Sequence, residues 1–171
     1  MKNYADFQAM QTPFIPLKGS YFAYHVYPHP AIRFRRDQDV LFHRSDVENV
    51  FRKFQADGWK PIESKHPFFS RHHLPTLTKQ GMPALELHWH ILKNHSFFDP
   101  EILWSDTAAG HEIPYCSHLC PEVHYLLTIY NMYFDRWQFG CRALLDLAFL
   151  QKKFPLNTEL IGKLNREWNL N

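Results

Sequence analysis

The chain has 171 residues, of which 45% are hydrophobic and 16% aromatic. This length fits one ordinary domain or two small ones, and the composition argues against a disordered protein. A formal net charge of +2 does not by itself require a nucleic-acid partner. The sequence has no apolar run long enough to span a membrane and no signal-peptide pattern, and its three cysteines fit a reducing compartment, so we expect a cytoplasmic protein.

The beginning of the chain predicts a short helix at 4–10, an edge strand at 14–17 and a second helix at 21–26. Lys18, Gly19 and Ser20 separate the strand from the second helix. Backbone N–H groups at the start of a helix, together with a serine hydroxyl, can hold phosphate oxygens. Taken alone, however, the tripeptide is better explained by a glycine that permits a turn and a serine that caps the helix.

The next predicted strand opens with two acidic residues. Asp37 and Asp39 are one residue apart and are followed by apolar residues up to Phe42. Successive side chains of a strand alternate between faces, so both carboxylates point the same way. Adjacent carboxylates repel each other unless a cation lies between them, and carboxylate oxygens are ligands that Mg²⁺ prefers. An Asp-x-Asp pair on an exposed edge is the plainer alternative.

Three arginines, Arg33, Arg35 and Arg36, precede this strand. If the strand begins that early, Arg33 and Arg35 lie on the side of the two aspartates. Positive charge beside carboxylates suits a polyphosphate substrate. Simple charge balance explains it equally well and is the commoner case.

A helix and a hairpin follow. Ser45 and Glu48 have the spacing of a capping box, apolar residues recur at helical spacing, and Gly58 ends the predicted helix. A strand is expected at 59–63. Residues 72–77 and 84–91 predict a hairpin around 79–81.

The second strand of the hairpin alternates in character. Leucines and other apolar residues at 85, 87, 89 and 91 line one face, and Glu86, His88 and His90 line the other. Glu86 could therefore join Asp37 and Asp39 as a third carboxylate, and three carboxylates on neighbouring strands can hold two Mg²⁺ ions. The alternative is the polar outer face of an antiparallel sheet.

Several short motifs, in this order and spacing, resemble the little-studied bacterial nucleotidyltransferases of the polymerase-β-like superfamily. They are Lys18-Gly19-Ser20, Tyr27-Pro28-x-Pro30, Arg33-x-x-x-Asp37-x-Asp39, His72-His73-Leu74-Pro75, Glu86-Leu87-His88-Trp89 and the helical segment 142–150. The resemblance covers roughly residues 14 to 153.

This resemblance implies an α+β fold with a mixed sheet and flanking helices. It also implies Mg²⁺-dependent transfer of a nucleoside monophosphate from an NTP to a hydroxyl, with two Mg²⁺ ions, or Mn²⁺ in their place. Carried onto this chain, Asp37, Asp39 and Glu86 are the metal ligands and catalytic carboxylates, and Asp39 or Glu86 accepts the proton of the hydroxyl. Gly19 and Ser20 occupy the nucleotide motif at the helix start, and we expect Lys18, Arg33 and Arg36 to contact the nucleotide as well. We expect His72, His73 and His88 to form hydrogen bonds around the carboxylates or to contact phosphate or the acceptor.

From residue 99 the chain predicts helices. Asp99-Pro100-Glu101 starts a short one, 105–119 is irregular, and further helices are expected from Pro121, at 136–153 and at 157–169. We therefore expect a catalytic domain at 1–98 and a small helical domain at 99–171. Asp146 lies in an apolar run, where Arg142 is the expected partner one turn earlier.

Two rival functions remain open at this point. One is a catalytically inactive protein of the same fold that acts as a regulatory or antitoxin-like partner. The other is a zinc-binding protein, with ligands from the histidines at 72, 73, 88 and 90 or from Cys116, His118 and Cys120. Neither group has a familiar zinc spacing. A homo-oligomer or a protein partner is also compatible with the sequence.

Overall fold

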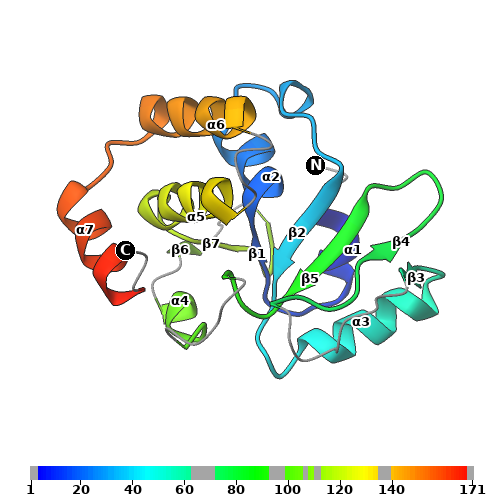
Figure 1. The fold of residues 1–171 in the computed structure, drawn as a ribbon. Helices are drawn as coiled ribbons and strands as arrows, with labels where there is room; N and C mark the ends of the chain where they lie inside the picture. The colour runs from blue at the N-terminus through cyan, green and yellow to red at the C-terminus, as the bar shows by residue number, and fades with distance from the viewer. Residues whose placement is uncertain are drawn as a thin grey trace.

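The computed structural model describes residues 4–62, 72–92, 99–105, 108–109, 113–134 and 140–168. Its centre is a five-stranded mixed sheet in the order β1-β2-β5-β4-β3, with helices on both faces (Figure 1). The strands are β1 (Ile15–Pro16), β2 (Asp37–Leu41), β3 (Lys60–Pro61), β4 (Leu77–Thr78) and β5 (Ala84–His88). A separate two-stranded sheet pairs β6 (Ala108–Ala109) with β7 (Ser117–His118). The expected α+β class is confirmed.

The described part of the chain also contains α-helices, a π-helix and a 3₁₀ turn. They are α1 (Ala5–Ala9), α2 (Lys18–Tyr21), a π-helix η2 (Phe22–Val26), a 3₁₀ turn η3 (Pro30–Ile32), α3 (Val47–Ala56), α4 (Ile102–Ser105), α5 (Pro121–Phe134), α6 (Gly140–Lys153) and α7 (Thr158–Glu167). In the part of the chain described here, no helix is both long enough and apolar enough to cross a bilayer.

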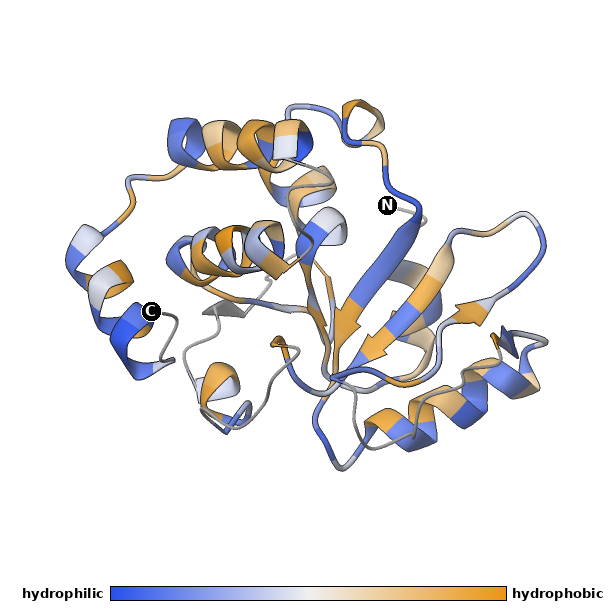
Figure 2. Ribbon diagram, in the orientation of Figure 1, coloured by the Kyte–Doolittle hydropathy of each residue, from blue (hydrophilic) through white to orange (hydrophobic). Residues whose placement is uncertain are grey.

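The two central strands, β2 and β5, run parallel, and their paired side chains alternate between the same two faces of the sheet. On β2, Val40 is buried in a core with Phe7 of α1 and Phe54 of α3, and Leu85 and Leu87 of β5 join the same core. Because neighbouring side chains of a strand point to opposite faces, the residues between them turn away from that core. In Figure 2 the start of β2 is hydrophilic and its end is hydrophobic. The side chains of Asp37 and Asp39, in the hydrophilic first part of β2, therefore face the other side of the sheet.

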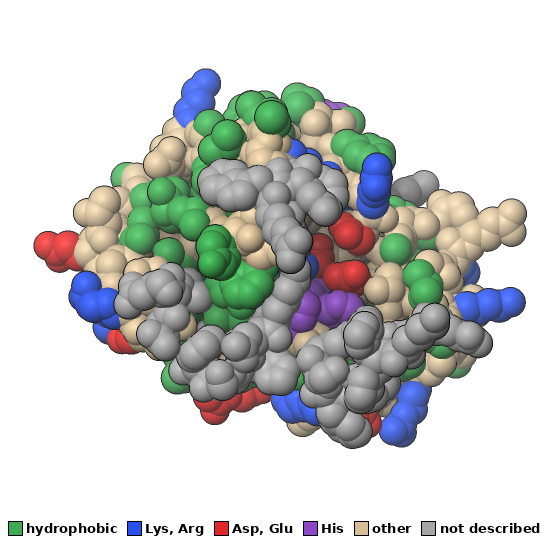
Figure 3. Space-filling model, in the orientation of Figure 1, with side chains coloured by type: hydrophobic (Ala, Val, Ile, Leu, Met, Phe, Trp, Pro, Cys, Tyr) green, Lys and Arg blue, Asp and Glu red, His purple; other side chains and the backbone are tan. Residues whose placement is uncertain are grey.

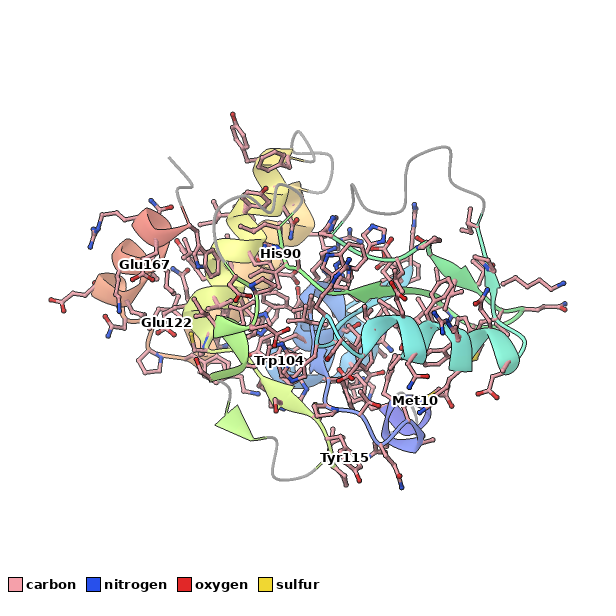
Figure 4. The ribbon with its side chains drawn as sticks, turned by 90° about the horizontal axis from the view of Figure 1, so that it is seen from below. Met10, His90, Trp104, Tyr115, Glu122 and Glu167 are labelled. Carbon is pink, nitrogen blue, oxygen red and sulfur yellow. The ribbon has the colours of Figure 1, made fainter. Side chains whose placement is uncertain are left out.

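Helices α5 and α7 cover that other side next to Leu41 of β2, with which Leu127 of α5 and Trp168 share a second core. The side chain of Glu122 on α5, labelled in Figure 4, accepts a hydrogen bond from the backbone N–H of Asn157 at 2.8 Å. A third core joins the π-helix to α6 through Leu150. The second and third cores each combine residues from before and after position 98, and the division of the chain there stays a prediction.

Most predicted elements are confirmed. The structure has the helix at 5–9, the edge strand with Pro16, the strand at 37–41, the hairpin of β4 and β5 with Gly81 at φ +77°, and the helix from Pro121. The last helix begins with Asn157 as its cap, whose side chain accepts hydrogen bonds from the N–H groups of Glu159 and Leu160. Residues 136–139 of the expected third helix lie outside the described part.

Several local predictions were wrong. Lys18, Gly19 and Ser20 do not separate β1 from the second helix but form its first turn, and residues 22–26 are a π-helix. The first strand of the hairpin is Leu77–Thr78 rather than 72–77.

The cap of α3 is Asp46, without a side-chain bond, so Ser45 and Glu48 form no capping box. The segment expected to be irregular contains β6 and β7, and β7 lies beside β1 because the N–H of Ser117 donates to the carbonyl of Phe14. Strand β5 ends at His88 rather than at 91.

Candidate functional site

The sheet register brings two acidic residues side by side. β2 and β5 pair in parallel, with Asp39 opposite Glu86 and Leu41 opposite His88. Partners in adjacent strands point to the same face. Asp37 lies two residues before Asp39 and shares that face. Figure 3 shows acidic side chains beside histidine side chains near the middle of this face of the molecule.

Lys18 and His88 contact the carboxylate of Asp39. The Nζ atom of Lys18 lies 2.6 Å from Oδ1 of Asp39, and Nε2 of His88 lies 2.9 Å from the same oxygen. Nε2 of His88 is also 3.6 Å from Oε2 of Glu86. Asp39 is 2% exposed and His88 is fully buried, so these contacts lie inside the protein. Among the described residues, Asp39, Glu86 and His88 form the group whose potential ligand atoms lie within 4.8 Å of one another.

Glu86 is held from two further sides. The hydroxyl of Thr76 donates to its Oε1 at 3.3 Å, and Nε2 of His73 lies 4.0 Å from its Oε2. The rings of His72, His73 and His88 lie within 4.7 to 5.1 Å of one another, measured between centroids. Of the three histidines named from the sequence, His73 and His88 thus lie beside the carboxylates, and His72 packs against both of these rings.

The pKa values report an excess of negative charge. Burial raises the pKa of Asp37, and the charges of Asp39 and Glu86 raise it further. Burial also opposes ionisation of Asp39 and Glu86. Lys18 and His88 outweigh it at Asp39, and His88, Lys18 and His73 at Glu86, so the pKa of both groups lies below its ordinary value. Three carboxylates thus face one ammonium group, which leaves two negative charges when the histidines are neutral.

A cavity of about 190 Å³ adjoins these carboxylates. Lys18, Gly19, Asp37 and Asp39 line one end of it. Helices α5 and α6 form the opposite wall with Thr128, Asn131, Met132, Arg142, Ala143 and Asp146. The cavity is therefore bounded by the acidic group on one side and by the C-terminal helices on the other.

The predicted phosphate motif is only partly on the cavity wall. Lys18 and Gly19 line the cavity, but the hydroxyl of Ser20 is buried elsewhere and has no hydrogen-bond partner among the described residues. The N–H of Ser20 donates to the carbonyl of Leu17. Lys18, not Gly19, has a left-handed backbone, with φ +45°. This geometry does not place Ser20 against a phosphate.

Of the three arginines that precede β2, Arg33 and Arg35 line the cavity and Arg36 does not. Arg35 lines the cavity, donates from Nη2 to the hydroxyl of Tyr24 at 2.6 Å and lies over that ring. Arg36, named as a nucleotide contact, is exposed and is not on the cavity wall. Arg35 has the same parity as Asp37 and Asp39, and that spacing was the signal that favoured it.

Arg33 lines the cavity, but its donors are already in use. Nε and Nη2 bind the two carboxylate oxygens of Asp146 at 2.7 and 2.8 Å, and Nη1 donates to the carbonyl of Phe34. The hydroxyl of Tyr27 also donates to Asp146, at 2.8 Å. The prediction that paired Asp146 with Arg142 missed these contacts, because both partners are more than 100 positions away in the sequence.

The fold is α+β, and its mixed sheet presents acidic side chains from two parallel strands beside a cavity lined partly by basic residues. This arrangement defines a candidate metal and phosphate site. The chain belongs to the family described as uncharacterised nucleotidyltransferase, which it matches over residues 4–171. This membership confirms the resemblance and indicates a general role in nucleotidyl transfer. No curated protein matches the sequence.

Proposed function

We propose that the protein transfers a nucleoside monophosphate from an NTP to a hydroxyl group, with divalent metal ions held by Asp37, Asp39 and Glu86. The observation that carries this proposal is the pairing of Asp39 with Glu86 across β2 and β5, on the face that Asp37 shares. Membership of the nucleotidyltransferase family supports it.

The side chains present fit a divalent metal ion. Carboxylate oxygens are hard ligands of the kind that Mg²⁺ and Mn²⁺ prefer. The raised pKa of Asp37 has burial as its main cause and the unbalanced charges of Asp39 and Glu86 as the next, and a bound cation would offset both. Bound metal ions would neutralise the triphosphate and the charge that develops at phosphorus. Two ions are proposed, by analogy with other three-carboxylate sites.

The reaction itself is an in-line displacement. The acceptor oxygen forms a bond to the α-phosphorus of the NTP, and the bond from that phosphorus to the bridging oxygen of pyrophosphate breaks. The proton of the acceptor hydroxyl passes to Asp39 or Glu86. In the metal-free protein His88 and Lys18 outweigh burial and hold the pKa of each group below its ordinary value, so both enter the reaction ionised, as a proton acceptor must be.

The triphosphate would lie along the basic side of the cavity. Lys18, Gly19, Arg35 and Arg142 line it, and Lys18 contacts the carboxylate of Asp39. Arg33 is engaged by Asp146 and would shape this wall rather than grip a phosphate. We place the nucleoside against α5, where Thr128 and Asn131 offer polar groups to the cavity.

Calorimetric titration with Mn²⁺ tests the metal site, and release of pyrophosphate from each of the four NTPs in the presence of a cell extract tests the reaction. We expect the double variant Asp37→Ala, Asp39→Ala to lose both. Asp57→Ala is the control, because Asp57 is exposed, caps the end of α3 and does not line the cavity. Unchanged Mn²⁺ binding in the double variant would reject these ligands.

The same experiments separate the two rival functions. Binding of Mn²⁺ and NTP without release of pyrophosphate would favour an inactive protein with a regulatory role. Stoichiometric zinc in protein purified without a histidine tag would favour the zinc protein. Among the described residues, Cys116, His118 and Cys120 do not form a group with converging ligand atoms, which weighs against the second of the two zinc sites considered.

A further inference from the structure

Lys18 has an unusual backbone for its position. It is the first residue of α2, and its φ of +45° is in the left-handed region, which is unfavourable for a residue with a side chain. Such strain persists where surrounding contacts hold it, and it is concentrated at functional sites. Here the strained residue lies directly beside the acidic group.

The side chain of Lys18 uses this backbone to reach the strand next to it. Leu17 donates its N–H to the carbonyl of Asp39 at 3.0 Å, which fixes α2 against β2. The ammonium group then lies 2.6 Å from Oδ1 of Asp39. Although burial lowers the pKa of Lys18, the charges of Asp39, Glu86 and Asp37 outweigh it and keep the pKa above its ordinary value. Lys18 is thus a fixed cation in the carboxylate group.

We propose that Lys18 is the counter-ion of the metal-free site, that a divalent metal ion displaces it from Asp39, and that the released ammonium group then binds the triphosphate. This inference rests on the proposed function. A metal ion held by Asp39 and Glu86 would share the carboxylate group of Asp39 with the ammonium group of Lys18, which now contacts its Oδ1. Two cations beside one carboxylate repel each other.

The released side chain has a place to go. Lys18 lines the cavity in which the triphosphate is proposed to lie, so it can leave Asp39 without leaving the site. Metal binding alone is then weakened by the ammonium group that it must displace. A nucleotide that attracts this group removes the penalty, and by linkage the metal strengthens nucleotide binding by the same factor.

Electron paramagnetic resonance titration with Mn²⁺, without nucleotide, tests the displacement. We expect Lys18→Met to bind Mn²⁺ about tenfold more tightly than the wild type, because a like charge beside the ion has been removed. Lys18→Arg keeps the charge and should bind Mn²⁺ as the wild type does. Lys79→Met is the matched control, since Lys79 lies in the exposed turn between β4 and β5 and its Nζ donates to the backbone carbonyl of Asp57.

The same variants are then titrated with a non-hydrolysable NTP analogue at saturating Mn²⁺. Here the expectation reverses, because Lys18→Met has lost a charge-assisted contact to phosphate and should bind the analogue about tenfold more weakly. A lysine with only a structural role would not produce tighter metal binding together with weaker nucleotide binding.

The outcomes are distinguishable from failure of the proposed function. If Mn²⁺ binding is unaffected by Asp39→Asn, the proposed metal site is wrong. If Mn²⁺ binding requires Asp39 but Lys18→Met binds it no more tightly than the wild type, only the displacement is wrong.

A measurement on the wild type covers the case in which Lys18→Met does not fold. Reactivity of the Lys18 amine towards an acylating reagent, followed by mass spectrometry, should rise when Mn²⁺ is added and fall again when the NTP analogue is added. Unchanged reactivity on addition of Mn²⁺ would overturn the proposal.

Discussion

Arg33 and Asp146 are 113 positions apart in the sequence and form a two-point ion pair, with Nε to Oδ1 at 2.7 Å and Nη2 to Oδ2 at 2.8 Å. Both residues are at least nine-tenths buried. The pair joins the segment that enters β2 to helix α6, and both side chains line the cavity. The shape of the cavity thus depends on a contact between the two halves of the chain.

Loss of one partner of this pair should be severe. Asp146→Asn leaves a buried guanidinium group without its counter-charge, and we expect the free energy of unfolding to fall by about 3–5 kcal/mol in urea denaturation. The control is Lys163→Met, which removes an exposed pair with Glu167 and should change the free energy by less than about 0.5 kcal/mol. Equal effects of the two substitutions would show that the buried pair adds nothing.

The two aspartates of β2 should respond in opposite directions when the protein is free of metal. Burial and the charges of Asp39 and Glu86 raise the pKa of Asp37, so its ionised form destabilises the fold at pH 7, and Asp37→Asn should raise the urea midpoint. The pKa of Asp39 is lowered, because Lys18 and His88 outweigh its burial, so Asp39→Asn should lower the midpoint. Measurements in a chelator at pH 7 check this, and shifts of the same sign would contradict it.

Three histidines near Tyr21 predict a loss of stability in acid. Burial lowers the pKa of His25 to about 4, and it also lowers the pKa of His118 and, strongly, of His124. The unfolded chain therefore binds more protons than the folded one below the ordinary histidine pKa of about 6.5. Stability should be full above that pH and should fall as the pH decreases from about 6.5 towards 4.

The variant His124→Phe isolates this effect. Phenylalanine can keep the stacking on Tyr21, where the ring centroids are 3.4 Å apart, but it binds no proton. Urea denaturation at several pH values should give a smaller loss of stability between pH 6.5 and 4 than in the wild type. An unchanged pH dependence would show that His124 is not one of the groups responsible.

The cap of α7 offers a test of local stability. The side chain of Asn157 accepts hydrogen bonds from two backbone N–H groups at 3.0 and 3.1 Å, so Asn157→Ala should lower the free energy of unfolding by about 1 kcal/mol. Asn157→Asp retains an acceptor and is the matched control. Thermal denaturation of the two variants should separate them, and identical midpoints would argue against a capping role.

The central strands and the acidic face were predictable because their signals are local. The alternation of Glu86 and His88 with leucines, and the spacing of Asp37 and Asp39, fix which side chains share a face whatever the rest of the fold does. The structure adds the register that puts Glu86 opposite Asp39, which depends on how the strands pair.

The features that sequence reasoning missed depend on distant contacts. Asp146 binds Arg33 and Tyr27, which lie more than 100 positions earlier in the chain. Strand β7 forms beside β1 because Phe14 and Ser117 meet. Nor could spacing show that the left-handed residue of the tripeptide is Lys18 instead of Gly19. The left-handed backbone of Lys18 goes with its contact to Asp39 on β2, which lies about 20 positions further along the chain.

The parallel pairing of β2 and β5 has a kinetic consequence. Asp39 and Glu86 are separated in the chain by α3, β3 and β4, and they meet only when β5 pairs with β2. A shift of this pairing by one residue would turn Glu86 into the apolar core. Long crossovers of this kind close late in folding. Affinity for divalent ions should therefore emerge with the last cooperative step of refolding, so that a metal-sensitive dye could time the completion of the native sheet.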